Sequence, residues 1–292
     1  MSEGRRRRAR PIVGSAVLLI LLAGCGSDDA PALSPPPADT ACDVGDIRGT
    51  YLYEVQGAGG ADTTPYLEVG LLVADGRGGV RGVGTGSRHH QESTTRWTLR
   101  VEDTCRATLT PEDPALAPLE ATLAPGGEEL TWFVVGATGV TDQPLLDGAA
   151  ERVDDTTQPR CDSATLTGTY LYRARGEYGG RAHVEQGFEV YNGDRVVTNA
   201  FRVAGSRLDG RLLGEYQFLD DCHAVVVYEN GQVLHQYVSP DGERFNWIQT
   251  DGFSAPGYFG GTERRVSMST EPAFVLGGVG PVEPTAPADP AS

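Results

Sequence analysis

The chain has 292 residues, which allows one to three domains, and its 39 glycines and 19 prolines predict many turns around a packed core. Its 24 basic residues are all Arg and are outnumbered by 40 Asp and Glu residues, which gives a formal net charge of −16. This balance disfavours nucleic acid and anionic membrane surfaces as partners.

The chain begins with a segment typical of exported proteins. Residues 5–10 are basic and residues 12–23 are apolar. This apolar run is too short to span a bilayer, which needs about 20 apolar residues. Residues 1–24 are therefore predicted to be a signal peptide. Its end, Leu22-Ala23-Gly24-Cys25, resembles the bacterial lipobox, in which the Cys after the cleavage point carries lipid. The resemblance implies a lipid bilayer as a partner through acylated Cys25, and Gly26 in place of Asp favours an outer membrane where the cell has one; the alternative is an ordinary signal peptide.

Low-complexity segments lie on both sides of the central region. Residues 25–41 are rich in Ser, Asp and Pro and are typical of a flexible tether. Residues 267–292 are rich in Pro and Ala and are predicted to be a disordered tail. Without the leader, 19 Arg residues remain against 39 acidic ones, so the net charge falls to near −20.

The central region contains two copies of one sequence. Cys42-Asp43, followed by Gly49-Thr50-Tyr51-Leu52-Tyr53, recurs as Cys161-Asp162, followed by Gly168-Thr169-Tyr170-Leu171-Tyr172. Further matches are Asp75-Gly76 with Asn192-Gly193, Cys105 with Cys222, Pro125, Gly127, Glu128 and Trp132 with Pro240, Gly242, Glu243 and Trp247, and Gly148-x-x-x-Arg152-Val153 with Gly261-x-x-x-Arg265-Val266. The repeat predicts domains at 42–153 and 161–266, joined by a polar linker at 154–160.

Turn dipeptides such as Asn192-Gly193 and Asp241-Gly242 separate short alternating segments in the second copy. The predicted strands are 168–174, 182–191, 195–204, 211–219, 223–228, 232–238, 244–249 and 257–266. No window has a helical period. Eight consecutive strands predict an all-β fold with one small up-and-down β-barrel per repeat, because closure removes exposed sheet edges.

The first and last predicted strands resemble those of the lipocalin family, in which G-x-W begins the first strand and an Arg of the last strand packs over the Trp ring. The matching residues are Gly49-Thr50-Tyr51 and Gly168-Thr169-Tyr170, with Tyr in place of Trp, and Arg152 and Arg265. The resemblance implies lipocalin-like barrels closed by cation–π contacts, each of about 0.5–2 kcal/mol. Each repeat is also similar to a class of uncharacterised bacterial lipoprotein repeats, which brings no activity with it.

Four cysteines allow three pairings, and the repeat selects Cys42 with Cys105 and Cys161 with Cys222. In an up-and-down barrel the start of the first strand and the turn between the fourth and fifth lie at the same end. Each disulfide is therefore predicted to close one barrel mouth, as suits an exported protein. The alternative, redox or metal-binding thiols, lacks a C-x-x-C pair.

The opposite end of each barrel is the natural entrance for a ligand. Barrels of this size are either filled by side chains or hold one small molecule. The residues expected at this mouth or lining the interior are Tyr53, His89, His90, Trp132, Tyr172, Tyr178, Trp247, Phe253 and Tyr258. Their aromatic rings either pack the core or line a cavity.

Other motifs predict no chemistry. His89-His90 has no Cys or carboxylate at ligand spacing, so no metal site is predicted. In Asp220-Asp221-Cys222-His223 the Cys is assigned to a disulfide. Gly82-x-Gly84-x-Gly86 lacks the strand-to-helix context of a phosphate loop. No catalytic constellation and no cofactor motif is found.

The sequence therefore favours a non-enzymatic lipoprotein of the cell envelope whose barrels bind a small apolar or aromatic molecule or an envelope component. One alternative is a structural or interaction module with filled barrels that acts through its outer faces. A second is a barrel enzyme of the isomerase or cyclase type. The three differ in whether the barrels contain a cavity.

Overall fold

The computed structural model describes residues 41–59, 64–102, 104–134, 145–203, 206–252 and 257–270. The predicted signal peptide, Cys25, most of the tether, the tail beyond residue 270 and Phe253 lie outside the described residues.

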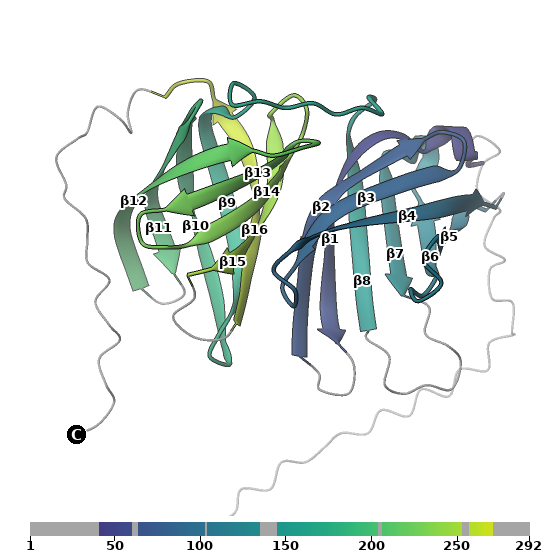
Figure 1. Ribbon diagram of the computed structural model, residues 1–292, viewed down its shortest axis with the longest axis horizontal. Helices are drawn as coiled ribbons and strands as arrows, with labels where there is room; N and C mark the ends of the chain where they lie inside the picture. The colour runs from purple at the N-terminus through teal and green to yellow at the C-terminus, as the bar shows by residue number, and fades with distance from the viewer. Residues whose placement is uncertain are drawn as a thin grey trace, which may run out of the picture. The chain divides into compact units, whose positions relative to one another are not determined.

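The described chain forms two closed barrels of eight antiparallel strands each, and sequential strands are neighbours in both (Figure 1). The strands of barrel 1 are β1 (Arg48–Gly59), β2 (Thr64–Asp75), β3 (Gly79–Gly86), β4 (Glu92–Val101), β5 (Arg106–Pro111), β6 (Leu119–Leu123), β7 (Glu129–Val134) and β8 (Leu145–Asp154). Those of barrel 2 are β9 (Thr167–Tyr178), β10 (Arg181–Asn192), β11 (Arg195–Val203), β12 (Ser206–Phe218), β13 (His223–Tyr228), β14 (Val233–Val238), β15 (Arg244–Asp251) and β16 (Gly257–Ser267). The predicted all-β class and the two up-and-down barrels are confirmed.

Alternation along each strand decides which side chains fill the barrels. Successive residues of a strand point to opposite faces, so every second residue enters the closed interior. In β9, buried and more exposed residues alternate from Gly168 to Gly176. Each barrel therefore has its own interior cluster, one including Tyr51, Tyr53 and Trp132 and the other including Tyr170 and Trp247.

Disulfides hold one end of each barrel. Cys42 is bonded to Cys105, in the turn between β4 and β5, and Cys161 to Cys222, in the turn between β12 and β13. Cys105 and Cys222 have φ angles of 61° and 62°, so both occupy the same left-handed turn position. The two disulfides indicate an oxidising compartment outside the cytoplasm.

The first and last strands meet beside the disulfide end. Tyr51 pairs with Arg152 and Tyr170 with Arg265. Among the described residues, however, the guanidinium groups are held by hydrogen bonds rather than by stacking on these rings. Arg152 donates to the carbonyl of Gly126 at 2.6 Å and contacts Glu128; Arg265 donates to the carbonyl of Asp241 at 2.8 Å and pairs with Glu243 at 2.5 Å.

The tyrosine hydroxyls complete the closure. That of Tyr51 donates to the carbonyl of Gly127 at 2.8 Å, and that of Tyr170 to the carbonyl of Gly242 at 2.7 Å. Strand 1, strand 8 and the turn between strands 6 and 7 are thereby fixed together in both barrels. This explains why Tyr, Gly and Arg recur together in the two repeats.

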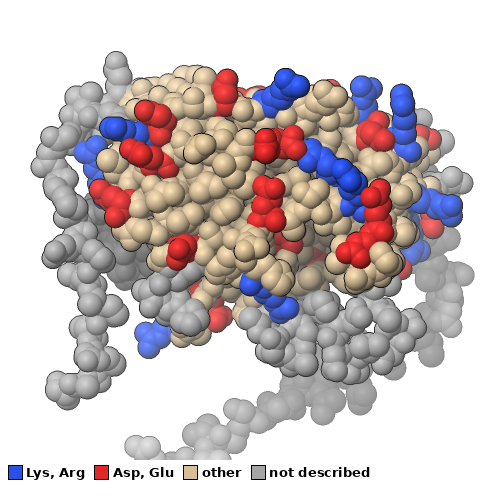
Figure 2. Space-filling model, in the orientation of Figure 1, with Lys and Arg blue, Asp and Glu red and all other residues tan. Residues whose placement is uncertain are grey.

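A third buried cluster contains outward-facing residues of both barrels, including Leu67, Leu71, Tyr237 and Ile248. Thr85 and Tyr237 share a hydrogen bond of 2.7 Å between their hydroxyls. On the face shown in Figure 2, Arg side chains lie among Asp and Glu side chains rather than in a separate basic patch. Among the described residues, no helix is long and apolar enough to cross a bilayer.

Candidate functional site

Barrel 1 contains a cavity of about 1110 Å³ that reaches the end opposite its disulfide. Its wall is chiefly apolar and aromatic, and the loops β3–β4 and β5–β6 form the described part of its rim. The lining includes Tyr53, Val55, Tyr66, Glu68, Leu72, His89, Trp97, Leu109, Leu119, Trp132, Val134 and Leu146. A cavity of this size and character suits a small, largely apolar molecule.

Glycines on β3 make room for the aromatic rings of this wall. A Cβ atom on Gly82 would lie 2.6 Å from the Trp97 ring, and one on Gly86 would lie 2.7 Å from the Tyr66 hydroxyl. A Cβ on Gly84 would overlap the Tyr53 hydroxyl. The Gly82-x-Gly84-x-Gly86 run therefore shapes the barrel interior, because its period of two places all three glycines on the inward face.

One carboxylate lies in the wall of this cavity. Glu68 accepts a hydrogen bond of 2.6 Å from the Tyr53 hydroxyl and a second from Tyr66. Burial, followed by the nearby Glu68 charge, raises the pKa of both tyrosines well above the usual range, so both remain protonated donors. Glu68 thus offers an oriented polar group beside the aromatic and aliphatic side chains of the wall, and further polar lining residues are Ser93, Thr94, Thr95, Arg96, Glu112 and Asp113.

Several predicted site residues are placed around this cavity. Tyr53 and Trp132 are buried and line it, and His89 lies at its rim. His90 is exposed in the β3–β4 turn, with a φ angle of 53°. Within the residues that the structure describes, no group of three or more His, Cys, Asp or Glu side chains forms a candidate metal site.

The interior of barrel 2 is different because it carries a network of polar side chains. Glu189, which is 5% exposed, accepts hydrogen bonds from Tyr191 at 2.7 Å, Thr198 at 2.7 Å and Tyr228 at 2.8 Å. Gln236 donates to the Tyr191 hydroxyl at 2.7 Å. The Glu189 carboxyl group is thus held in place by three hydroxyl donors.

Glu263 lies beside this network and is 3% exposed. It adjoins Glu189 and the Trp247 indole, yet neither carboxyl oxygen makes a hydrogen bond of good geometry within the described structure. Burial, and next the charge of Glu189, raises the pKa of Glu263 well above its usual range. Its surroundings therefore favour the protonated form of Glu263.

Strand register shows that this network belongs to repeat 2 alone. Tyr51 pairs with Leu72 whereas Tyr170 pairs with Glu189, and Tyr53 pairs with Ala150 whereas Tyr172 pairs with Glu263. By the same registers Thr198, Gln236, Tyr228 and Tyr191 are equivalent to Gly82, Ala121, Pro111 and Ala74. Barrel 1 thus has apolar or small residues at the positions equivalent to the two glutamates and to the four other polar residues of the network. Because barrel 1 is closed all the same, closure does not require these polar groups.

One polar pair is shared by both repeats. Glu68 is equivalent to Glu185, and the Tyr172 hydroxyl donates to Glu185 at 2.7 Å as Tyr53 donates to Glu68. In barrel 2, Tyr178 at the end of β9 forms an edge-to-face contact with His183, with ring centroids 4.8 Å apart. Of the predicted mouth residues, Tyr178 thus lies at the open end of barrel 2, whereas Tyr258 packs partly against the outward-facing cluster.

Sequence reasoning missed Glu68, Glu189 and Glu263. The signal was available in the repeat itself. Glu263 lies inside the matched segment Gly261-x-x-x-Arg265, where repeat 1 has Ala150. When one copy of a repeated strand has an acidic residue where the other copy has an inward-facing apolar residue, the acidic residue is predicted to be a buried carboxyl group.

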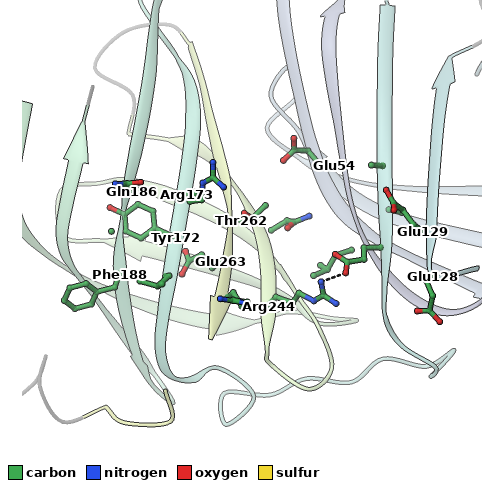
Figure 3. A pocket seen from close by; sticks show the side chains of 18 residues that line it. Glu54, Glu128, Glu129, Tyr172, Arg173, Gln186, Phe188, Arg244, Thr262 and Glu263 are labelled. Carbon is green, nitrogen blue, oxygen red and sulfur yellow. Dashed lines mark ion pairs between the residues drawn. The ribbon is translucent and has the colours of Figure 1, made fainter. Parts of the chain in front are cut away.

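Two further features lie outside the barrel interiors. A groove of about 1300 Å³ is lined by both barrels and crossed by an ion pair of 2.6 Å between Arg244 and Glu151 (Figure 3). Elsewhere, His223 is buried, and its Nε2 lies 2.9 Å from Nδ1 of His235. Burial lowers the pKa of both histidines to about 4, so they are neutral at pH 7 and do not supply an acid.

No protein-family profile and no curated protein sequence matches the chain. Among solved structures, the chain is similar to a DUF3598-family protein of unknown function from Nostoc punctiforme, with 9% identity and a TM-score of 0.28 over 76% of this chain and 97% of that one. It is also similar to kievitone hydratase from Nectria haematococca, with 6% identity and a TM-score of 0.25 over 81% of this chain and 94% of that one. These distant likenesses carry no argument about activity.

The buried Glu263 predicts an unusual dependence of stability on pH. A group whose pKa is raised in the folded state contributes stability below its unfolded pKa of 4.5, and this contribution is lost as pH rises. In urea unfolding, we expect the free energy of unfolding of Glu263→Gln to rise relative to that of the wild type as the pH increases above 5, because only the wild type must keep a carboxyl group from ionising. The exposed Glu215→Gln, on the outer face of the same barrel, should show no such gain. Parallel curves for wild type and Glu263→Gln would contradict the buried protonated carboxyl.

Proposed function

We propose that this protein is a binding protein of the cell envelope that holds a small, largely apolar or aromatic molecule in barrel 1. The observation that carries the proposal is the cavity of about 1110 Å³ lined by aromatic and aliphatic side chains. Shallow apolar surface is common in proteins, but a large apolar cavity inside a closed barrel is retained at a cost in packing.

The polar groups of the cavity support a preference within this class. The Glu68 carboxyl group, held by the hydroxyls of Tyr53 and Tyr66, is an oriented acceptor in the inner wall, and the basic residues Arg96 and His89 are also among those that line the cavity. A ligand with one hydroxyl or N–H donor on an apolar or aromatic body satisfies both features. A ligand carboxylate would be repelled by Glu68.

The cellular setting of the proposal follows from the N-terminus. A lipid on Cys25, followed by the tether of residues 25–41, would hold the barrels near a membrane while leaving the cavity mouth accessible. The disulfides are compatible with this location, since they form outside the cytoplasm.

Filling the cavity tests the binding proposal. Val134 lines the cavity, whereas its neighbour Phe133 is 53% exposed on the outer face of β7. Because the indole would occupy ligand volume, we expect Val134→Trp to weaken binding of the neutral probe N-phenyl-1-naphthylamine at least tenfold, about 1.4 kcal/mol. Phe133→Trp should bind as the wild type does. The proposal fails if the wild type leaves the probe fluorescence unchanged, or if both variants bind equally well.

The anchor is tested separately by metabolic labelling with an alkyne fatty acid. We expect label on the wild-type chain and none on Cys25→Ala. Absence of label on the wild type, or label retained by the variant, would remove the lipid anchor from the proposal without affecting the cavity.

A further inference from the structure

The buried carboxyl pair of barrel 2 points to a second site that is chemically distinct from the cavity of barrel 1. We propose that Glu189 and Glu263 bind a primary ammonium group inside barrel 2, so that this barrel takes a small organic amine. The proposal does not rest on ligand binding by barrel 1.

The interior of barrel 2 is acidic. Glu185, Glu189 and Glu263 all face inward, and none of the described groups that contact Glu189 or Glu263 is basic. Burial of unpaired carboxyl groups is unfavourable, and barrel 1 shows that the fold accepts apolar residues in place of Glu189 and Glu263. A cationic ligand would compensate the buried charge.

Two buried polar groups other than the carboxyl groups also lack partners in barrel 2. The indole N–H of Trp247 and the amide oxygen of Gln236 are unpaired in the described structure, and these residues are 4% and 0% exposed. Gln236 is linked through the Tyr191 hydroxyl to Glu189, and Trp247 adjoins Glu263. Both unpaired groups therefore belong to the surroundings of the carboxyl pair.

The balance of donors and acceptors identifies the ligand class. Once Glu263 has lost its proton, the unpaired acceptors are three oxygen atoms, one on Gln236 and two on Glu263, and the Trp247 indole N–H beside Glu263 can donate to the same carboxylate. An ammonium group has three N–H donors and no acceptor, which matches this set. A calcium ion would need six to eight oxygen ligands, and the site is instead surrounded by aromatic rings.

Aromatic rings continue from the carboxyl pair toward the open end of the barrel. The ring of Trp247 packs against Phe259 at 5.2 Å, and Phe259 packs against His183 at 5.0 Å between centroids. Tyr178 covers His183 at the end of β9. This column surrounds the approach to the carboxyl pair with aromatic rings, and ring faces near an ammonium group add favourable cation–π interactions.

Binding would be linked to a proton. At neutral pH the O–H bond of protonated Glu263 breaks, its proton passes to solvent, and the carboxylate left behind pairs with the already protonated amine. About one proton should therefore be released per ligand bound. Binding of a neutral ligand would release none.

The test is isothermal titration calorimetry of the purified full chain with n-butylamine hydrochloride at pH 7, in buffers of different ionisation enthalpy, with n-butanol as the neutral isostere. We expect saturable binding of the amine alone, with release of about one proton. Glu263→Gln should weaken binding at least tenfold and abolish proton release. Glu189→Leu with Glu263→Ala, which installs the residues of repeat 1, should abolish binding; circular dichroism checks that each variant is folded.

Further controls separate the two barrels and the competing ligands. Val134→Trp, in the cavity of barrel 1, should bind the amine as the wild type does. The proposal is overturned if the amine does not bind, if butanol binds equally well, or if Glu263→Gln keeps full affinity. It is also overturned if only Val134→Trp loses binding, or if calcium chloride binds in place of the amine in a manner that depends on Glu263.

Discussion

Closure of each sheet, first strand on last, is the constraint on which the rest of this structure depends. It converts the alternation of a β-strand into a strict division between inside and outside, so each inward residue must fit a space shared by eight strands. Hydrogen bonds secure this closure beside the disulfides. In barrel 1 they join Tyr51 and Arg152 to the turn at Gly126 and Gly127, and in barrel 2 they join Tyr170 and Arg265 to the turn at Asp241 and Gly242. With one end fixed, variation is left to the interior and to the opposite mouth.

The duplicated fold uses that freedom in two ways. In barrel 1, glycines on β3 make room for the aromatic rings that line a cavity, and the Glu68 carboxyl group with its two tyrosine donors lies in the wall of that cavity. In barrel 2, the equivalent positions carry longer polar side chains that surround Glu189. Such a network is costly to bury unless its groups are satisfied, which is why the unpaired atoms around Glu263 bear on function.

The sequence predicted those features that a local pattern of residues or the repeat determines. Turn dipeptides, alternation and the duplicated Cys positions predicted the strands, the barrel class and the disulfide end, because each depends on neighbouring residues or on the repeat. The interaction of Arg152 was predicted in the wrong form, since its carbonyl partners lie in a turn that only the closed barrel brings near. The cavity and the carboxyl pair could not be predicted, because both depend on inward residues from many strands at once. Even so, Glu263 could have been noticed as the one acidic replacement within a matched motif.

The central claim is that two barrels of one design differ inside, with barrel 1 able to carry a ligand. Native mass spectrometry of the full chain, purified without detergent exchange from an oxidising compartment, tests it most directly. We expect a reproducible additional mass that is lost on denaturation, is absent from Val134→Trp and is retained by Phe133→Trp. A bare polypeptide mass for the wild type, unchanged after incubation with apolar and aromatic small molecules, would contradict it and favour filled barrels that act through their outer faces.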